Sequence, residues 1–345
     1  MKSKVLRGLS GGVDSAVAAA LLQQEGAEVI GLFLHNGSTC ADADLAAARA
    51  VSRDIGIEFR TADISAALRE RVELPFAEEY LRGRTPNPCV MCNPAVKFAA
   101  LCAEADCIGA DTVATGHYAQ LKEHPCGLRL LWDDGSPRDQ SYMLARLGAN
   151  ALSRCRFPLG GLSKEDVREI ARKLGISVAE RPDSMEICFI PDNDYAAFVE
   201  RTLGVPPEGD FVDAEGNVLG RHRGIHRYTV GQRKGLGIAL GYPAYVSRID
   251  AEQNRVVLAA AGGEYRQEIV LRDCLWHAPM PAVFDAQVKV RHTKRPAAAR
   301  VTLGEEKRAE ITFAEPVRAP APGQTAAIQQ EGFVIGCGYI GDAEG

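Results

Sequence analysis

Residues 10–15, Ser-Gly-Gly-Val-Asp-Ser, lie where a short apolar run ends and an alanine-rich, helix-forming stretch begins. Glycines at a strand-to-helix turn allow backbone N–H groups and the helix N-terminus to converge on phosphate oxygens. The run is not a Walker A motif, because no Gly-Lys-Ser or Gly-Lys-Thr follows it. The turn therefore suits a phosphate group, although a plain strand-to-helix connection uses the same residue types.

A second candidate for chemistry is the pair Cys89 and Cys92, spaced C-x-x-C within a proline-rich segment. Pro94 suits the first position of a helix, and Asn93 suits its N-cap. Cys92 would then directly precede a helix N-terminus, where the helix dipole lowers the pKa of a thiol below its ordinary value of about 8.5. Cys188 stands alone between a polar and an apolar run, and such a cysteine is most often a packing residue.

The elements that must position these residues alternate along the first part of the chain. Apolar runs predict strands at residues 5–9, 28–34, 57–61 and 112–115. Helices are predicted up to residue 24, over residues 42–54, from Pro94 onward, and from the N-cap Ser163 to about residue 175. This alternation indicates an α/β fold with a doubly wound parallel sheet, and helical character continues to about residue 200.

The chain changes character beyond Leu203, where glycine, proline and short alternating segments predict one or two small β domains. Strands are expected at residues 286–291 and 308–313, and residues 284–291 alternate apolar with mostly basic side chains. Two stretches, 220–235 and 289–300, are rich in Lys, Arg and His. Such runs are usually solvated faces, but they also suit contacts with a phosphate backbone. Tyr228 suits either base stacking or the core.

Composition limits the alternatives. The chain has 345 residues, of which 46% are hydrophobic and 25% charged, so disorder, collagen and coiled coil are excluded. A net charge of -5 gives no global basic field, and a polyanion would have to be bound by a local surface. No apolar run approaches the roughly 20 residues of a membrane span and no export signal is evident, so a soluble, cytoplasmic protein is expected. The ten cysteines are then thiols for chemistry, metal or packing.

The phosphate turn resembles the pyrophosphate loop of the ATP pyrophosphatase superfamily, whose members cleave ATP between the α and β phosphates. Taken over the whole chain, the sequence resembles the bacterial tRNA-specific 2-thiouridylase family, MnmA. The motifs that carry this resemblance are residues 8–15, 31–34, 83–93, 114–118, 139–142, 187–190, 229–237 and 322–324.

The resemblance implies three domains: an adenylating domain over residues 1–200 with the doubly wound parallel sheet, a small central domain over 201–262, and a C-terminal β barrel over 263–345. It also implies ATP and Mg²⁺ as cofactors, tRNA as partner and substrate, and no membrane. The implied reaction is 2-thiolation of the wobble uridine, in which ATP adenylates the C2 oxygen and sulfur replaces it. The sulfur donor would be sulfide, a cysteine desulfurase or a sulfur relay protein.

Carried over residue by residue, the resemblance assigns three sets of positions. The ATP site would comprise Gly8, Leu9, Ser10, Gly11, Gly12, Val13, Asp14, Ser15, Leu34 and Gly116, with Asp14 also placed to bind Mg²⁺. The tRNA contacts would be Asn87, Pro88, Cys89, His117, Arg138, Asp139, Gln140, Arg291, His292 and Gln324. Cys92 would be the nucleophilic or sulfur-handling cysteine, and Cys188 would receive persulfide sulfur.

One position departs from the best-known members of the family. They carry aspartate, taken as a general base, as the first residue of a D-x-x-C motif, and this chain has Cys89 there. A thiol does not replace a carboxylate base. We hypothesise instead that Cys89, Cys92 and Cys188 hold a 4Fe-4S cluster by three irons, which leaves the fourth iron free for an exogenous sulfide.

Other interpretations remain open at this stage. An ATP-dependent amidating or lysine-adding ligase would use the same loop without the three cysteines, and a tRNA-binding or iron–sulfur carrier protein would release no pyrophosphate. A zinc site formed with Cys102 and Cys107 lacks the second C-x-x-C motif. A thioredoxin-like pair leaves the phosphate loop unexplained. The tRNA isoacceptors, the oligomeric state and the roles of the other cysteines are not fixed by the sequence.

Overall fold

A computed structural model describes residues 3–182, 187–292 and 295–342. The chain divides into two compact units. As far as they are described, the first comprises the residues up to 72, 89–193 and 331–334, and the second comprises 73–88, 194–330 and those from 335 onward. None of the described helices is both long and apolar enough to cross a membrane.

A five-stranded parallel sheet forms the centre of the first unit, in the order β3-β2-β1-β4-β7. Its strands are β1 (Lys4–Gly8), β2 (Glu28–His35), β3 (Glu58–Asp63), β4 (Thr112–Ala114) and β7 (Cys155–Arg156). The chain runs outward from β1 to β3 and then returns to the other side of β1 at β4. Ligands bind such sheets at the carboxyl ends of the strands beside this reversal of strand order. The predicted α/β class and doubly wound parallel sheet are confirmed.

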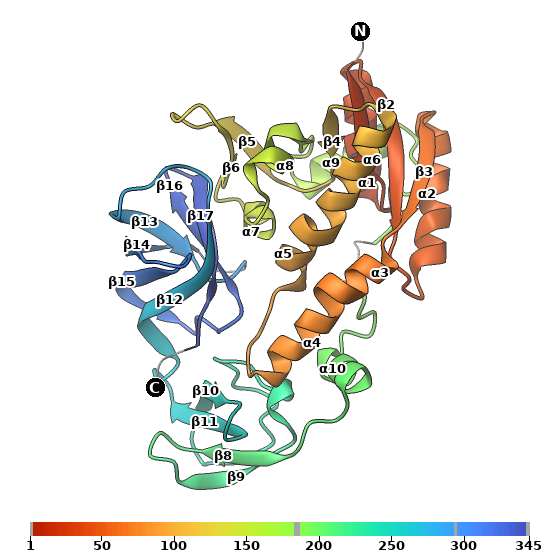
Figure 1. The fold of residues 1–345 in the computed structure, drawn as a ribbon. Coiled ribbons are helices and arrows are strands. Elements are labelled where there is room, and N and C mark those ends of the chain that lie inside the picture. The colour runs from red at the N-terminus through yellow and green to blue at the C-terminus, as the bar shows by residue number, and fades with distance from the viewer. Residues whose placement is uncertain (1–2, 183–186, 293–294, 343–345) are drawn as a thin grey trace. The chain divides into compact units, whose positions relative to one another are not determined.

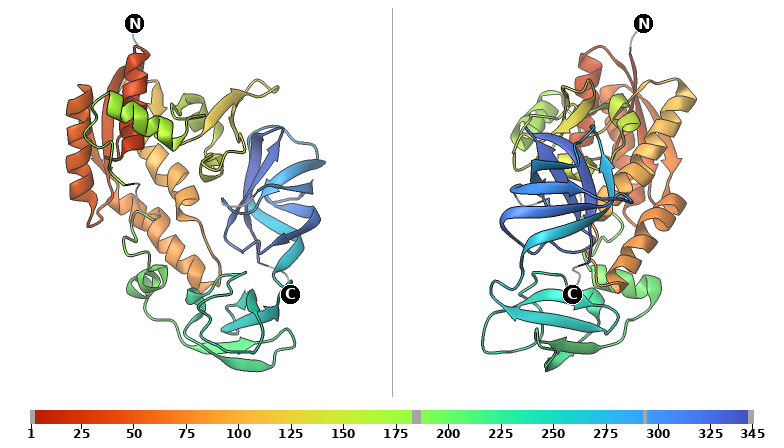
Figure 2. Two further views of the ribbon diagram at one scale, coloured as in Figure 1. Left: turned by 180° about the vertical axis from the view of Figure 1, so that it is seen from behind. Right: turned by 60° about the vertical axis from the view of Figure 1, so that its left-hand side comes forward.

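Helices cover both faces of the sheet. The helix α6 (Phe98–Ile108) lies on the face toward the viewer in Figure 1. The helices α1 (Val13–Gln24), α2 (Ala41–Ile55) and α9 (Lys164–Lys173) pack together, and α1 and α9 are in front when the molecule is seen from behind in Figure 2. Alanines and valines of α1 are fully buried against Val5 and Val29. Burial of this apolar layer fixes the start of α1 beside the end of β1.

Two helical runs contain a π-helical turn. In the first, α3 (Ser65–Leu68) continues through η1 (Arg69–Glu73) into α4 (Leu74–Leu81), and in the second, α5 (Pro88–Cys92) continues through η2 (Asn93–Lys97) into α6. The prediction of a helix start at Pro94 with Asn93 as N-cap is therefore wrong. Pro88 begins the helix instead, and the side chain of Asn93 donates a hydrogen bond to the Met143 carbonyl at 2.8 Å.

The remaining elements of the first unit follow the sheet. The strands β5 (Gln120–Glu123) and β6 (Arg129–Trp132) form an antiparallel hairpin, and Trp132 pairs with Phe333. Two short helices follow, α7 (Ser141–Leu144) and α8 (Ala149–Arg154). The predicted N-cap Ser163 is confirmed, since its side chain accepts the Asp166 backbone N–H at 3.1 Å in a capping box with that residue.

The second unit contains a small sheet domain. The helix α4 packs against α10 (Tyr195–Leu203), with the Tyr80 and Tyr195 rings stacked at 5.0 Å. The sheet has the order β10-β11-β8-β9, formed by β8 (Gly209–Val212), β9 (Val218–His222), β10 (Ala244–Asp250) and β11 (Arg255–Ala260), with the short helix η3 (Ile225–Arg227) beside it. Tyr228 is 3% exposed and lies in the core with Phe211, which settles its role as packing.

The second unit ends in a closed six-stranded barrel. Its strands are β12 (Tyr265–Trp276), β13 (Val283–Lys289), β14 (Ala297–Leu303), β15 (Ala309–Arg318), β16 (Thr325–Gln330) and β17 (Phe333–Ile340). They follow the order β12-β15-β14-β13-β16-β17, and β12 also pairs with β17. Along β13, Phe284, Ala286 and Val288 are buried and alternate with exposed residues, so the predicted period-two pattern is confirmed as far as Val288. The predicted basic wet face is wrong at Lys289, which is 7% exposed, and Arg291 is only half-exposed.

Candidate functional site: a phosphate loop and three thiols

The phosphate loop leaves the carboxyl end of β1 at the reversal of strand order, which is where the fold places a ligand. Gly11 has a φ of +77°, and a Cβ at this position would lie 2.6 Å from the Asp44 carbonyl oxygen. Gly12 is the N-cap of α1, and no side chain caps the helix there. The loop therefore needs glycine at position 11, and its N-cap residue gives the first backbone N–H groups of α1 no side-chain hydrogen bond.

Within the loop, serine side chains hold the backbone. Ser15 Oγ donates to the Gly12 carbonyl at 2.8 Å and accepts the Ser10 backbone N–H at 3.2 Å. Leu9 and Val13 are 2% and 3% exposed and belong to the core. At these two predicted ATP positions only the backbone can face a ligand.

Asp14 is the charged residue of the loop, and it is engaged. Lys164 Nζ lies 2.7 and 2.9 Å from its two carboxylate oxygens, and the Tyr118 hydroxyl donates to Oδ1 at 2.7 Å. Lys164 is 4% exposed although it directly follows the N-cap of α9. Sequence reasoning missed both partners, and a lysine at the first position of a helix, where cations are unfavourable, was the available signal.

Two further groups adjoin the loop. Arg181 donates to the Gly11 carbonyl at 2.8 Å and to Asp44 Oδ1 at 2.6 Å. Gly116 follows β4, and a Cβ there would lie 3.1 Å from the Ser15 backbone nitrogen and 3.0 Å from Arg7 Nη2. The structure thus brings predicted residue Gly116 against the loop, where a larger residue would push the backbone away.

Leu34 connects the loop region to the cysteines. It directly follows the buried part of β2, is half-buried, and packs in a cluster with Val96, Cys92 and Phe189. Phe189 directly follows Cys188, and Cys92 belongs to the helix that continues into α6. The same small apolar cluster therefore positions two of the three predicted thiols.

Cys89, Cys92 and Cys188 are brought together in the first unit. All three lie outside disulfides, Cys188 is exposed, and Cys89 and Cys92 are half-buried. Cys188 acts electrostatically on the thiols of both other cysteines. The expectation that Cys188 alone would be a buried packing residue is wrong, because Cys188 is exposed and acts electrostatically on the other two thiols.

The predicted activation of Cys92 by a helix N-terminus is not observed. Cys92 lies inside the helical run, and burial raises the pKa of its thiol to about 11, with Lys97 opposing that shift. Burial likewise raises the pKa of the Cys89 thiol, again opposed by Lys97. In the metal-free state the two thiols are therefore protonated at neutral pH.

Cys102 does not extend this group. Its thiol interacts with Arg154, Asp106 and Cys155. Among the described residues, the group of metal-ligand side chains whose ligand atoms all lie within 4.8 Å consists of Asp133, Asp134 and Asp139. A compact zinc site built from Cys89, Cys92, Cys102 and Cys107 is thus not formed in the described chain.

His117 interacts electrostatically with Arg7, which bonds to the loop, and with Lys97, which acts on the thiols. Its ring stacks on Phe98, contacts Phe157 edge-on, and shares a 2.6 Å hydrogen bond through Nδ1 with the Thr115 hydroxyl. Burial lowers the pKa of His117 well below its ordinary value, helped by the positive charges of Lys97 and Arg7. The ring is therefore neutral at neutral pH and offers no charge to a phosphate.

Three predicted tRNA contacts lie in the loop between β6 and α7. Asp139 accepts from the backbone N–H and the hydroxyl of Ser141, and Gln140 Oε1 accepts the Tyr118 backbone N–H at 2.9 Å. Arg138 is exposed and lies 5.9 Å from the centre of the Tyr118 ring. An open pocket of about 350 Å³ is lined by Arg138 and Asp139 together with Tyr118 and Lys164, the two residues that hold Asp14.

Five other predicted tRNA contacts belong to the second unit. Gln324 donates to the Thr85 carbonyl at 2.6 Å, and Arg291 Nη2 donates to the Val230 carbonyl at 2.9 Å. Asn87 and His292 are half-buried, and Pro88 is buried. Gln324 and Arg291 thus already have structural partners, and their roles toward tRNA stay predictions.

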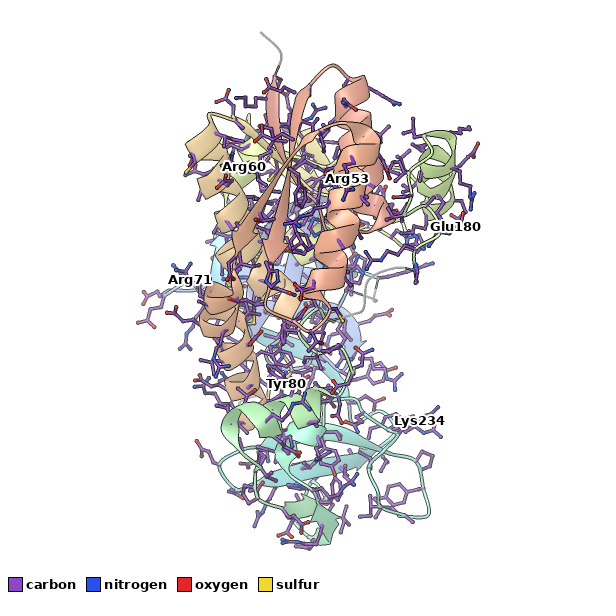
Figure 3. The ribbon with its side chains drawn as sticks, turned by 90° about the vertical axis from the view of Figure 1, so that its right-hand side faces the viewer. Arg53, Arg60, Arg71, Tyr80, Glu180 and Lys234 are labelled. Carbon is purple, nitrogen blue, oxygen red and sulfur yellow. The ribbon has the colours of Figure 1, made fainter. Side chains whose placement is uncertain are left out.

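Several side chains of the basic stretches form ion pairs within the protein. Arg221 pairs with Asp210, and Arg227 and the buried His226 both pair with Glu200. Arg223, Arg233 and Lys234 are exposed, and within the described chain no carboxylate pairs with them. Figure 3 shows Lys234 extending away from its loop. Lys294 of the second stretch lies outside the described residues, and Arg295 is exposed.

A parallel α/β sheet with an uncapped glycine loop at its strand-order reversal defines a nucleotide-binding class of protein. Three family models match the chain: the tRNA methyl transferase HUP domain at residues 3–192, the tRNA methyl transferase PRC-barrel domain at 196–260, and the aminomethyltransferase beta-barrel domain at 266–340.

Curated relatives named tRNA-specific 2-thiouridylase MnmA match along their full length. The protein of Acidithiobacillus ferrooxidans is 43% identical over 99% of this chain and 99% of its own. That of Syntrophotalea carbinolica is 43% identical over 99% and 100%, and that of Geobacter metallireducens 40% over 98% and 97%. A solved 4-thiouridine synthetase–RNA complex with bound ATP is similar at a TM-score of 0.36, with 18% identity over 54% of this chain and 45% of that one. The chain belongs to the tRNA-specific 2-thiouridylase MnmA family.

Proposed function

We propose that this protein is an ATP-dependent tRNA-uridine 2-sulfurtransferase that thiolates the wobble uridine and releases AMP and pyrophosphate. The observation that carries this proposal is the presence, in one compact unit, of an uncapped phosphate loop and three cysteines that interact electrostatically. The names of the full-length relatives support the same substrate and reaction.

ATP binds at residues 8–15, with its phosphates on the backbone N–H groups at the start of α1. Asp14 fits as a single protein ligand for a Mg²⁺ ion that is held mainly by phosphate oxygens. Its carboxylate oxygens already accept from Lys164 and Tyr118, so the ion would share Asp14 with these donors or displace them. The ion would neutralise charge on the phosphates.

The reaction has two balanced steps. The C2 oxygen of the uridine attacks the α phosphorus of ATP, a P–O bond forms, and pyrophosphate leaves. A sulfur nucleophile then adds to C2, the C2–O bond breaks, and AMP leaves with the oxygen that the uridine has lost. The first step needs the loop, and the second needs a sulfur source close to C2, which the three thiols suit.

Cys89, Cys92 and Cys188 fit a three-cysteine cluster site, because thiolates are the ligands of iron–sulfur clusters, none of the three is in a disulfide, and Cys188 acts electrostatically on the other two. A bound 4Fe-4S cluster would supply an iron without a protein ligand, at which an exogenous sulfide binds. Burial that disfavours free thiolate at Cys89 and Cys92 is offset when a metal replaces the proton.

The alternative sulfur route needs no cluster. Cys188, which is exposed, receives a persulfide sulfur from a donor protein, and the terminal sulfur passes to C2. The two remaining sulfurs, of Cys188 and Cys92, are left as a disulfide, which an external thiol reduces. In that route Cys89 has no assigned task, so Cys89 discriminates between the two routes.

For tRNA, we propose contacts by Asn87, Pro88, Cys89 and His117 near the extruded base, because chemistry on a base requires that it leave the stack. Arg138 is exposed beside the pocket that adjoins Asp14 and is free to contact phosphate. Asp139, Gln140, Arg291, His292 and Gln324 complete the proposed set, with the structural bonds given above.

The decisive experiment measures iron and acid-labile sulfide in anaerobically purified protein, and tRNA thiolation with ATP before and after iron chelation. We expect about four irons per chain, loss of thiolation on chelation, and loss of both iron and thiolation in Cys89→Ala. Cys107→Ser is the matched control, because Cys107 is an exposed thiol of the same helical run.

Each outcome has a clear consequence. Iron-free protein that thiolates from a persulfide donor, with Cys89→Ala active, overturns the cluster and supports the Cys92–Cys188 route. Pyrophosphate release without any thiolation, unaffected by all three cysteine substitutions, overturns the sulfurtransferase and favours a ligase. Absence of tRNA-dependent pyrophosphate release from wild-type protein overturns the enzyme itself.

A further inference from the structure

The most deeply buried charge of the first unit is Arg7, in the middle of the central strand β1. Its residue is 0% exposed, and it is the largest fully buried side chain among the described residues. Its neighbours Val5 and Leu6 are apolar core residues. A charge in such a position costs a large desolvation free energy unless the fold or a ligand compensates it.

The guanidinium reaches the underside of the phosphate loop. Nη1 donates to the Gly8 carbonyl at 2.5 Å and to the Ala114 carbonyl at 3.2 Å, and Nη2 donates to the Ser15 carbonyl at 3.0 Å. Nε has no partner. The three carbonyls belong to the end of β1, the end of β4 and the first turn of α1. Arg7 therefore connects the three elements that meet at the reversal of strand order.

The charge of Arg7 lacks an ion-pair partner. Its acceptors are neutral carbonyls, and no carboxylate in the described chain lies within ion-pair distance of it. The other two cations at the loop do have carboxylates, since Lys164 pairs with Asp14 and Arg181 pairs with Asp44. Burial lowers the pKa of Arg7, with Asp14 opposing the shift, but a guanidinium keeps its proton in proteins. Around the loop, the three cations Arg7, Lys164 and Arg181 thus face the two carboxylates of Asp14 and Asp44, and both carboxylates are already paired with another cation.

We propose that Arg7 is a positioning residue that supplies a fixed, desolvated positive charge beneath the loop, which is compensated when the phosphates of a nucleotide bind above it. It acts through the loop backbone and does not touch the ligand. This inference rests on the proposed ATP site and goes beyond it, because it assigns phosphate selectivity to a residue outside the loop motif.

The distinction from a merely structural role lies in ligand charge. A residue that only braces the backbone affects every ligand of the site alike. A residue that acts through its charge affects ligands in proportion to their negative charge, because the interaction follows Coulomb's law in a medium of low polarisability. Adenosine, AMP, ADP and ATP form a series that varies this charge and keeps the base constant.

The test is calorimetric binding of that series, without tRNA, to wild-type protein and to Arg7→Met, which keeps the length and removes the charge. We expect the affinity for ATP to fall about tenfold or more, with a progressively smaller fall for ADP and AMP and less than about twofold for adenosine. Arg7→Lys should retain most of the ATP affinity. Arg156→Met, which removes an arginine from the edge strand β7 of the same sheet, should bind the whole series like wild type.

The outcomes separate this inference from the proposed function. Equal losses for adenosine and ATP in Arg7→Met, or no loss for either, overturn the inference, whereas wild-type protein that binds no ATP overturns the ATP site itself. If Arg7→Met does not fold, Arg7→Gln replaces it. A measurement on wild-type protein adds a further test: pyrophosphate without Mg²⁺ should raise its Tm, and no rise in a protein that binds ATP overturns the inference.

Discussion

The phosphate loop of the first unit is surrounded by charged side chains, whereas the thiols of Cys89 and Cys92 are kept uncharged. Around the loop, cations and carboxylates lie close together, with Lys164 and Tyr118 on Asp14 and Arg181 on Asp44. Around the thiols, the surroundings are apolar and burial keeps Cys89 and Cys92 protonated. The loop is prepared for an anion before ligand arrives, whereas Cys89 and Cys92 stay protonated despite the positive charge of Lys97 and need a metal or a persulfide to react.

The strongest way to break this comparison is Gly11→Ala. The new Cβ would lie 2.6 Å from the Asp44 carbonyl at a φ of +77°, so the loop would have to move. We expect ATP-dependent pyrophosphate release to fall more than about a hundredfold, because misplaced backbone donors no longer meet the phosphates. Stopped-flow or radiometric pyrophosphate assays measure the effect.

Gly26→Ala is the matched control for this substitution. Gly26 has a φ of +88°, but nothing lies within 4 Å of a Cβ there. Both variants carry the cost of a left-handed residue, about 1–2 kcal/mol, and only Gly11→Ala also meets a clash. Equal activity losses in the two would show that strain, and not the closeness of the loop to Asp44, explains the effect.

Cys92→Ser sharpens the comparison by separating the two steps. Cys92 is a sulfur-handling residue in either proposed route, so we expect thiolation to fall below about 1% of wild type. At least stoichiometric pyrophosphate release should persist, because the loop is intact. Thiolation is measured by mass spectrometry of tRNA nucleosides, with Cys107→Ser as control. Loss of pyrophosphate release as well would mean that the two regions do not act separately.

His117 tests the boundary between the two regions through pH. Because its folded-state pKa is lowered, the unfolded chain takes up a proton first as the pH falls through about 6.5. Stability is therefore fully present above that pH and is lost as the pH falls toward the folded-state pKa. The expected slope is up to about 1.4 kcal/mol per pH unit.

The free energy of unfolding, measured by chemical denaturation at several pH values between about 5 and about 7, gives that slope. In His117→Asn the slope should become flatter, whatever the absolute stability, because one titrating group is gone. An unchanged slope would mean that the ring is not held neutral between Phe98 and Phe157.

Tyr118→Phe has the smallest expected effect. It removes one neutral donor from Asp14, while both contacts of Lys164 with the carboxylate remain. Such a bond contributes about 0.5–1.5 kcal/mol, so the KM for ATP should rise by roughly two- to tenfold with kcat little changed. A collapse of kcat instead would give the hydroxyl a part in the chemistry.

Much of the fold and of the phosphate loop can be predicted from residues that are close together in the sequence. The positive φ of Gly11 belongs to a turn of a few residues, and Ser163 with Asp166 forms a capping box within one turn. Apolar runs such as β2 are buried along most of their length and mark central strands. Each of these features depends on neighbours in the sequence, so the sequence was sufficient to predict it.

The thiol region depended on tertiary partners. Asn93 and Pro94 have the local character of a helix start, but Pro88 begins the helix and Asn93 binds the Met143 carbonyl, 50 residues away. The thiol pKa values follow burial in a cluster that includes Leu34 and Phe189, from distant parts of the chain. Lys164 was missed because its partner Asp14 is 150 residues away. Arg7 was missed because its complete burial and its bond to the Ala114 carbonyl arise only in the folded sheet.

The π-helical turn at Asn93–Lys97 has a consequence for engineering by deletion. A π turn holds one more residue than an α turn over the same span, so it offsets the angular phase of everything after it by about 100°. Removing one residue there would let the run from Pro88 to Ile108 become uniformly α-helical. Every side chain outside the deleted position would stay in the protein, yet Cys92 and Phe98 would face new directions relative to each other. The length of this segment therefore sets the rotation of Cys92 about the helix axis relative to α6, which packs on the sheet. A single-residue deletion in the turn would change that rotation without replacing any of the three cysteines.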